Sequence, residues 1–347
     1  MWYFQDVYSI YYCFGTIDWY IYAMTRILTW LKSTAEQFHI ANFFGAVAPM
    51  LNYQSQWLEC YLMVADLHSM TKFESNVLKN HIKRSRDFIK IYLAAWVDPT
   101  KTTIFQQSHI PEHLSLSWIL GCATHMWFMQ RMHAYKDAIN KWSADSTSIG
   151  TFTYPILMAA DILLYDIDLV PVGKDQKQHV EYARDIAGKF NTNFGDMFVL
   201  PQAKITTFGE IPGIDWRKMS KSYDNYIGIM ESPEEIYKKV KRILTDAIPV
   251  EAPKDPMTDV LYRILLPLMS DAEKMRIDND YLWWGMSYKL LKDFLYEKIV
   301  WFVSPLQKVY ADISDDYIDT LIINHTNKAQ TIASHTMKRV QQKIFGA

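Results

Sequence analysis

The stretch that decides the fold reads Ile156-Leu-Met-Ala-Ala-Asp-Ile-Leu-Leu-Tyr165, then Leu169-Val-Pro-Val172, then the run Gln176–Phe190. The first and third segments place apolar residues at helical spacing, and the second is a short apolar run of strand length. A helix, a buried strand and another helix in this order are typical of a parallel α/β sheet.

The same alternation continues upstream. Three further strand-like runs are Arg26–Thr29, Leu62–Ala65 and Thr103–Gln106. We therefore predict an α/β fold with a Rossmann-like, doubly wound parallel sheet, whose ligand crevice lies beyond the carboxyl ends of the strands.

Downstream of about residue 223 the strand pattern fades and helices take over. Ser232-Pro-Glu-Glu235 is a capping box with proline at the first helical position, and a continuous apolar face runs from Ala329 to Ile344. We expect a C-terminal helical domain and four parts in the whole chain. These are an aromatic N-terminal extension (1–25), a catalytic domain (26–222), a helical domain (223–318) and a last helix that packs back on the body (319–347).

Composition limits the functional classes. Half of the 347 residues are apolar, which suffices for a sizeable core, and a net charge of −2 excludes a globally basic nucleic-acid binder. Cys13, Cys60 and Cys122 are too few and too far apart for a disulfide framework, so a reducing, cytoplasmic compartment is expected. Asp6 and Asp18 interrupt the apolar start, so we predict no membrane span.

Glycine is scarce. The chain has 12 glycines in 347 residues, about half of the roughly 7% usual in soluble proteins. A chain so poor in glycine should contain few loops that approach phosphates closely, because glycine permits both close approach and positive φ.

One polar loop nevertheless suits a polyphosphate. Lys218-Met-Ser-Lys-Ser222 places two lysines around small hydroxyl residues, between Pro212-Gly-Ile-Asp215 and Tyr223-Asp-Asn225. Each ammonium group can meet charge that develops on a leaving pyrophosphate.

This loop resembles the KMSKS signature of class I aminoacyl-tRNA synthetases. The segments Thr153–Tyr165 and Val170–His179 are similar, nearly residue for residue, to the amino-acid-binding segments of tryptophanyl-tRNA synthetases. Shorter segments agree in order and spacing from about residue 26 to the C-terminus, among them Met63–His68, Gln107–His113 and Ser115–Trp118.

The resemblance implies a reaction. The carboxylate of L-tryptophan attacks the α-phosphate of ATP, which Mg²⁺ accompanies, and the tryptophanyl group then passes to tRNA(Trp). It also implies a cytoplasmic homodimer that has no membrane or DNA partner. No covalent enzyme intermediate and no dedicated protein metal site are needed, so catalysis rests on positioning and charge stabilisation.

The resemblance also assigns residues for tryptophan. Asp161 would accept the indole N–H, which is a donor only. Tyr154 and Gln176 would hold the ammonium group, and Met158 and Val172 would line the slot.

For ATP the resemblance points to the ends of the strands and to the KMSKS-like loop. Lys136, Lys218 and Lys221 would act on the phosphates, although a solvated helix lysine is an equal alternative for Lys136. The remaining ATP-binding candidates are Lys32, Ser33, Thr34, His39, Ala41, Asn42, Gly173, Lys174, Asp175, Ile205, Met219, Ser220 and Ser222.

The chain departs from the family pattern at several glycines. Trp30, Ala35 and Ala41 stand where the first nucleotide-binding segment has glycine, as do Trp96 and Trp216 elsewhere, and position 174 is commonly Glu. A relative that binds tryptophan or tRNA without efficient activation therefore stays open. A tyrosine-specific enzyme is the other alternative, since a phenol is a donor too, and only the resemblance of the extended segments decides against it.

Two basic stretches, Lys79–Lys90 and Lys238–Arg242, are candidates for tRNA phosphates. A solvated helix face is the alternative for both, because only clustering on one surface makes an electrostatic footprint.

Overall fold

The computed structural model describes residues 25–31, 38–71, 73, 75, 80–132, 135–136, 139, 147–173, 176–205, 211–220 and 223–346. Two compact units make up this part of the chain. The sheet unit takes in the described residues of 25–31, 53–205 and 313–346, and the helical unit takes in those of 38–52 and 211–312.

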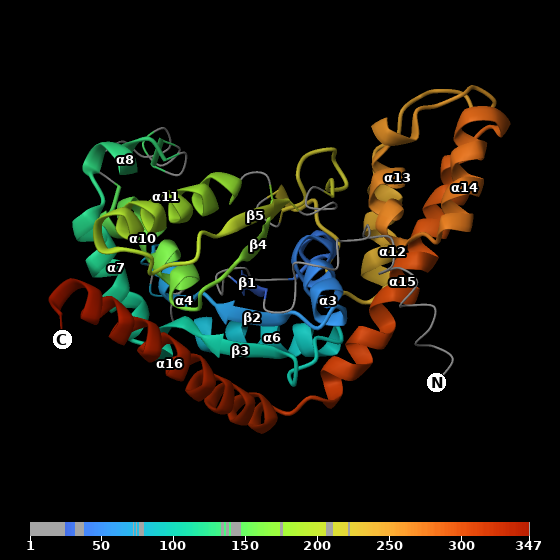
Figure 1. Ribbon diagram of the computed structural model, residues 1–347. Helices are drawn as coiled ribbons and strands as arrows, with labels where there is room; N and C mark the ends of the chain where they lie inside the picture. Colours follow the sequence, from blue (N-terminus) through green and yellow to red (C-terminus); the bar gives the residue numbers. More distant parts are fainter. Residues whose placement is uncertain are drawn as a thin grey trace. The chain divides into compact units, whose positions relative to one another are not determined.

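The sheet unit is built on five parallel strands in the order β3-β2-β1-β4-β5 (Figure 1). The order reverses between β1 and β4, which is where a doubly wound sheet opens its ligand crevice. The predicted Rossmann-like fold is therefore confirmed. The strands are β1 (Arg26–Leu31), β2 (Glu59–Val64), β3 (Thr102–Gln106), β4 (Leu169–Val172) and β5 (Gln202–Ile205).

One predicted strand needs correction, and one strand was not predicted. The predicted strand Leu62–Ala65 is wrong in its bounds, because β2 begins at Glu59 and ends at Val64. The strand without a prediction is β5, a four-residue edge strand of sequence Gln-Ala-Lys-Ile that is largely exposed. Its partly polar, mostly exposed sequence lacks the apolar run that marked the other strands.

Helices pack against the strands of the sheet, among them α16 against β3 and α11 against β5. The predicted helix Ile156–Tyr165 begins earlier, at Ile149, because the Ser148 side chain caps it by accepting the N–H of Thr151. The helices of this unit are α4 (Asp66–Ser69), α6 (His81–Ala94), the 3-10 turn η2 (Gln107–His109), α7 (Glu112–Ala123), α8 (Met126–Gln130), α10 (Ile149–Leu163), α11 (Lys177–Phe194) and α16 (Asp315–Phe345).

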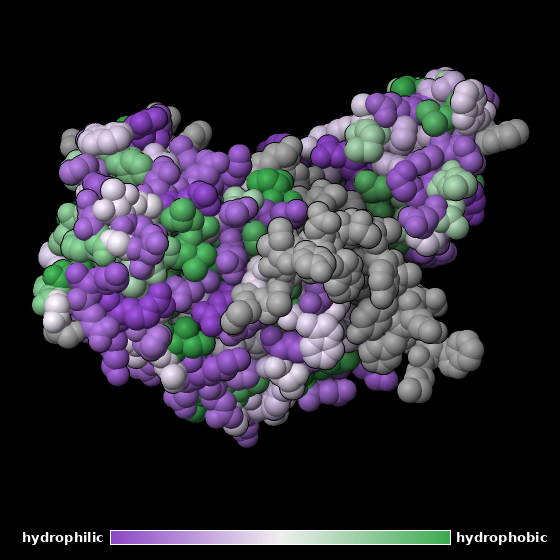
Figure 2. Space-filling view, in the orientation of Figure 1, coloured by the Kyte–Doolittle hydropathy of each residue, from purple (hydrophilic) through white to green (hydrophobic). Residues whose placement is uncertain are grey.

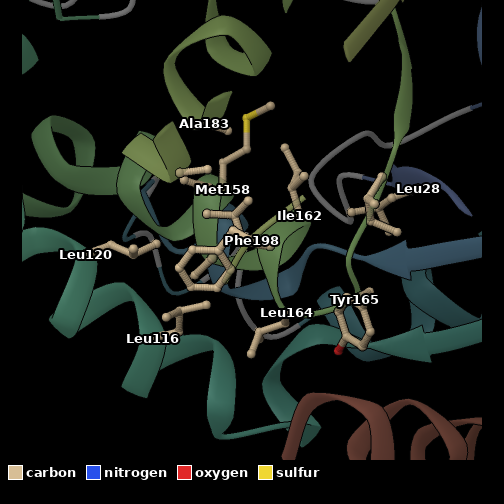
Figure 3. Close-up of a cluster of buried hydrophobic side chains, with 14 of the residues drawn as sticks. Leu28, Leu116, Leu120, Met158, Ile162, Leu164, Tyr165, Ala183 and Phe198 are labelled. Atoms are coloured by element: carbon tan, nitrogen blue, oxygen red, sulfur yellow. The ribbon is translucent and has the colours of Figure 1, made fainter. Parts of the chain in front are cut away.

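The core of the sheet unit surrounds α10. Figure 3 shows Met158 and Ile162 of this helix among leucines of α7 and Phe198, with Tyr165 at the edge of the cluster. The apolar face of α16, from Ala329 to Val340, joins the same core, and Figure 1 shows this last helix alongside β3 and α7. Each large apolar side chain buried in this way contributes about 1.5–3 kcal/mol.

The helical unit begins with a continuous helical segment, in which the π-helical turn η1 lies between α2 and α3. Residues before it pair with a distant stretch, since His39 forms an antiparallel bridge with Gly228. Phe43 and Phe44 then pack on Phe302, with ring centroids 4.7 and 5.5 Å apart. The elements are α2 (Ile40–Asn42), η1 (Phe43–Val47), α3 (Ala48–Ser55), α12 (Pro233–Arg242), η5 (Pro256–Thr258), α13 (Val260–Leu265), η6 (Leu266–Leu268), α14 (Asp271–Asn279), η7 (Asp280–Trp284) and α15 (Tyr288–Asp312).

The predicted capping box is present at the start of α12, where Ser232 and Glu235 exchange side-chain and backbone hydrogen bonds. The visible face of the molecule is mostly hydrophilic, with separate apolar spots (Figure 2). Within the described part of the chain, no helix has the length and hydrophobicity needed to cross a membrane.

Candidate active site

Asp161 lies at the centre of a buried hydrogen-bond network in the sheet unit. Its Oδ1 is 2.6 Å from His113 Nδ1 and 2.7 Å from Gln107 Nε2, and its Oδ2 is 2.7 Å from His68 Nε2. The carboxylate has no exposed area. His113 continues the network through Nε2, which is 2.9 Å from the Tyr165 hydroxyl.

The network keeps Asp161 ionised. Burial alone would raise its pKa, but hydrogen bonds from His113 and His68 outweigh burial and lower the pKa to about 2. A buried carboxylate of this kind only accepts hydrogen bonds. The sheet unit therefore offers a fixed anionic acceptor inside an apolar core.

Three partners of Asp161 were not assigned roles by the sequence analysis. His68 lies on α4 directly after β2, Gln107 follows the last residue of β3, and His113 belongs to α7. His68 and Gln107 could have been found from their positions just after two strands, because the carboxyl ends of parallel strands meet at the crevice.

Three other residues predicted to bind tryptophan, Tyr154, Met158 and Val172, lie close to this network or in the hydrophobic core. Met158, which Figure 3 labels, and Val172 both belong to the buried hydrophobic core, against which the half-buried Trp30 packs. Trp30 thus contacts the core. The Tyr154 hydroxyl is 2.7 Å from His179 Nε2, and the two rings stack with centroids 5.6 Å apart.

His39, in the helical unit, caps the helix that begins at Ile40. The His39 ring Nδ1 accepts the backbone N–H of Asn42 at 3.3 Å, and the His39 backbone N–H donates to the Asn42 side-chain oxygen. Burial lowers the pKa of His39 to about 4, so the ring is neutral near pH 7. Because Nδ1 accepts, the ring proton resides on Nε2.

The described residues of the KMSKS-like loop, Lys218–Ser220, are organised by Asn225, a residue to which the sequence assigned no role. Asn225 Oδ1 accepts the N–H of Ser220 at 2.7 Å, and Nδ2 donates to Asp215 Oδ1 at 2.6 Å and to the Lys218 carbonyl at 3.1 Å. A Cβ at Gly213 would lie 2.2 Å from Asn225 Nδ2. Asn225, which is almost fully buried, therefore needs glycine at position 213.

The remaining candidates differ in their surroundings. Lys218 is exposed and Met219 is buried, while Ala41, Gly173 and Gln176 are half-buried. Lys136 is exposed, and its N–H bonds to the Met132 carbonyl; Ile205 ends β5 and is 36% exposed. Seven predicted residues lie outside the described part: Lys32, Ser33, Thr34, Lys174, Asp175, Lys221 and Ser222.

Several cations of the two basic stretches form ion pairs within the protein. In α12, Lys239 pairs with Glu231 at 2.5 Å and Lys241 with Asp293 at 2.6 Å. From α6, Arg86 and Lys90 pair with acidic residues of α16. These pairs reduce the positive charge that either stretch presents.

Possible metal ligands and cysteine thiols are the remaining chemical groups of the described residues. Among them, no group of three or more His, Cys, Asp or Glu side chains could hold a metal ion. Cys60 and Cys122 are free cysteines, and burial raises the pKa of the Cys60 thiol to about 12. The candidate chemistry therefore rests on Asp161, His39 and the loop at Lys218.

Comparison with known proteins agrees with this geometry. Residues 23–276 match the family model described as tRNA synthetases class I (W and Y). The chain belongs to this family.

Several similar proteins are named as tryptophan–tRNA ligases. The chain is 36% identical over 312 residues to a tryptophan–tRNA ligase of Fusobacterium nucleatum, covering 88% of this chain and 94% of the relative. It also resembles the crystal structure of tryptophanyl-tRNA synthetase from Campylobacter jejuni complexed with ADP and tryptophan, with a TM-score of 0.80 and 34% identity over 92% of this chain and 99% of that one. The Mycoplasma pneumoniae enzyme gives a TM-score of 0.77 at 28% identity, over 93% of this chain and 98% of that one.

Proposed function

We propose that this chain is a tryptophan–tRNA ligase. It activates L-tryptophan with ATP to tryptophanyl-adenylate and pyrophosphate, then transfers the tryptophanyl group to tRNA(Trp). The observation that carries the proposal is the buried, ionised Asp161 on α10, the helix that also places Met158 in the apolar core to which Val172 belongs. An indole has an apolar body and one N–H donor, so it needs an apolar slot with one buried acceptor.

The substrate's polar end is proposed to meet the crevice side of α10 and α11. Tyr154, whose hydroxyl is already oriented by His179, and Gln176 at the start of α11 would bind the ammonium group. This arrangement directs the tryptophan carboxylate toward the nucleotide. The reaction needs no covalent enzyme intermediate. Much of the rate enhancement therefore comes from holding the tryptophan carboxylate and the α-phosphate in line.

The nucleotide is proposed to bind at three places. Gly173, Lys174 and Asp175 would face the ribose after β4, and Ile205 would contact adenine. Lys32, Ser33, Thr34, Ala41 and Asn42 would surround the phosphates, toward which the neutral His39 would donate through Nε2.

The leaving pyrophosphate is proposed to meet the KMSKS-like loop. Lys218 and Lys221 would stabilise its charge, Met219, Ser220 and Ser222 would shape the loop, and Lys136 would approach the phosphates from a second segment. Mg²⁺ would arrive with the nucleotide, since magnesium is often bound through substrate phosphates and only one or two carboxylates.

We further propose a cytoplasmic homodimer with a functional division of the chain. Residues 26–222 would activate tryptophan, 223–318 would read the tRNA anticodon, and 319–347 would pack back on the body. The compact units divide the chain elsewhere, near residues 52, 206 and 312, so this division concerns function. Four exposed apolar side chains on the consecutive helices α7 and α8 are candidates for contact with a second copy of the chain: Leu114, Trp118, Met126 and Trp127.

The direct test is tryptophan-dependent exchange of pyrophosphate into ATP by the purified protein. We expect exchange with tryptophan and none with tyrosine. A folded sample that binds tryptophan in calorimetry but supports no exchange at saturating ATP and Mg²⁺ would refute the proposal and favour a relative that does not activate its amino acid.

A further inference from the structure

The contacts of His113 suggest a role in the slot that no sequence motif assigned. Its ring is fully buried, stacks on Phe105 with centroids 6.2 Å apart, and uses both nitrogens. Nδ1 must carry a hydrogen, because the ionised Asp161 only accepts. The Tyr165 hydroxyl can donate or accept, so it satisfies Nε2 in either protonation state of the ring.

The two oxygens of Asp161 are used unequally. Oδ1 receives two donors, from His113 and Gln107, whereas Oδ2 receives one, from His68. A carboxylate oxygen has two acceptor positions, so Oδ2 retains capacity. The His68 side chain is 11% exposed, whereas His113 and Gln107 are fully buried. The Oδ2 side therefore lies nearer the solvent.

We propose that His113 is a positioning residue for substrate recognition. With its ring oriented by Tyr165, it holds Oδ1 of Asp161 so that Oδ2 receives the N–H donor of an indole. Asp161 lies in the last turn of α10, Tyr165 follows the end of this helix, and His113 on α7 bridges the two side chains. Hydrogen bonds of this kind to a ligating group fix its orientation. This inference rests on the proposed function.

The test uses two ligands of nearly the same shape: tryptophan, and β-(3-benzothienyl)alanine, in which sulfur replaces the indole N–H. The readout is the ratio of their dissociation constants, measured by calorimetry. We expect His113→Leu to lower the preference for tryptophan by tenfold or more, and Tyr165→Phe to lower it severalfold. His113→Asn should retain most of the preference, because its Nδ2 replaces the Nδ1 donor.

The controls separate positioning from folding and from the proposed function. His335→Leu changes an exposed histidine on α16 and should leave the ratio unchanged. If His113→Leu does not fold, the ratios of Tyr165→Phe and His113→Asn test the inference. It then requires a lower preference for tryptophan in Tyr165→Phe and a largely retained preference in His113→Asn. An unchanged ratio in folded His113→Leu or Tyr165→Phe overturns the inference alone. A wild-type protein that binds tryptophan without pyrophosphate exchange overturns only the proposed function, and one that does not bind tryptophan overturns both.

A second, independent observation concerns three tryptophans with left-handed backbones. Trp57, Trp96 and Trp216 have φ of 61°, 64° and 73°. Bulky side chains rarely adopt this region. Among the residues that the structure describes, the two other non-glycine residues with positive φ are Asp166 and Asp224, and aspartate tolerates this region.

Trp57 ends a helix in a motif that favours glycine. Its N–H bonds to the Gln54 carbonyl, and the N–H of Leu58 reaches back to the Tyr53 carbonyl. This pair of bonds defines a Schellman motif with Trp57 at the left-handed position, and the buried Leu58 and Tyr53 match its usual apolar contact.

Trp96 repeats the motif after α6. Its N–H bonds to the Leu93 carbonyl, and the N–H of Val97 bonds to the Tyr92 carbonyl. Trp216 lies at the end of a tight turn. The Trp216 N–H donates to the Gly213 carbonyl, and the Gly213 N–H donates to the Arg217 carbonyl. Next to this turn, Pro212 and Lys218 form an antiparallel bridge. This turn also places its left-handed residue where glycine is usual.

We infer that these three positions are glycine sites and that the cells that make this protein insert glycine there. All three carry the same residue type, so one codon, translated as tryptophan in this sequence and decoded as glycine in the source, accounts for them together. Glycine removes the left-handed strain at each position.

Two measurements test this inference. Peptide mass spectrometry of the protein purified from its source should find glycine at all three positions, and tryptophan there overturns the decoding claim. In the recombinant chain, Trp57→Gly, Trp96→Gly and Trp216→Gly should each raise the unfolding temperature, by roughly 1–3 °C. Trp118→Gly, at an exposed site within α7, should lower it. Unchanged or lower temperatures for the three variants overturn the structural claim.

Discussion

Asn225→Asp is the sharpest perturbation of the KMSKS-like loop, because it keeps the shape of the side chain. The Ser220 N–H can still donate to one oxygen, as it does to Asn225 Oδ1 at 2.7 Å. The other oxygen would replace Nδ2, which is 2.6 Å from Asp215 Oδ1 and 3.1 Å from the Lys218 carbonyl. Two hydrogen bonds are lost and two carboxylates face each other.

The magnitude has a lower and an upper bound. Two unit charges 2.6 Å apart repel by about 1.6 kcal/mol in water and about 6 kcal/mol at an effective dielectric constant of 20. Protonation of one carboxyl limits the cost, since at pH 7 it requires about 4 kcal/mol for an ordinary pKa. The loop arrangement should therefore lose about 2–4 kcal/mol at pH 7.

The assay is kcat/KM for ATP in tryptophan-dependent pyrophosphate exchange between pH 5.5 and 8. We expect at least about a 30-fold loss at pH 7, since 1.4 kcal/mol corresponds to a factor of ten. The proximity of Asp215 raises the pKa of the new carboxyl, so the loss is present above that pKa and diminishes as the pH falls. At pH 5.5 the limiting cost is only about 2 kcal/mol.

The control is Asn327→Asp, which adds the same charge at an exposed site on α16 and should leave the kinetics unchanged. If Asn225→Asp has the wild-type kcat/KM for ATP at pH 7.5, the loop does not depend on the Asn225 hydrogen bonds and the reasoning fails.

Other substitutions test the hydrogen-bond network of Asp161 and the packing of Gly213 against Asn225. Asp161→Asn should lower the free energy of unfolding in urea by about 3 kcal/mol, because it removes a charge that three donors surround, whereas the exposed Asp185→Asn should change it by less than ~0.5 kcal/mol. The pKa of Asp161 is lowered on folding, so its stabilisation is present above about pH 4 and is lost as the pH falls through about 2; acid unfolding followed by circular dichroism should show a stability loss in this range that Asp161→Asn lacks. Gly213→Ala should abolish pyrophosphate exchange or raise the KM for ATP at least tenfold, since its Cβ overlaps Asn225, while Gly188→Ala, which has open space, should leave both unchanged; equal kinetics for the two variants would contradict the packing argument.

The sequence by itself determined the parallel α/β fold, the capping box at Ser232 and the family. These features depend on local patterns, because alternation, helical spacing and capping involve residues close in the chain. The edge strand β5 escaped because it has too few apolar residues to leave such a pattern.

Only the tertiary structure decided how the site is held. The partners of Asp161 come from positions 93, 54 and 48 residues away, and no local pattern pairs His68, Gln107 and His113 with it. The sequence marked Trp96 and Trp216 as departures from glycine, but the strain at each became visible only when the backbone bonds fixed a positive φ. Burial and backbone geometry arise from the whole fold, so the charge of Asp161 and the conformational cost of these tryptophans could not be derived before the chain was assembled in three dimensions.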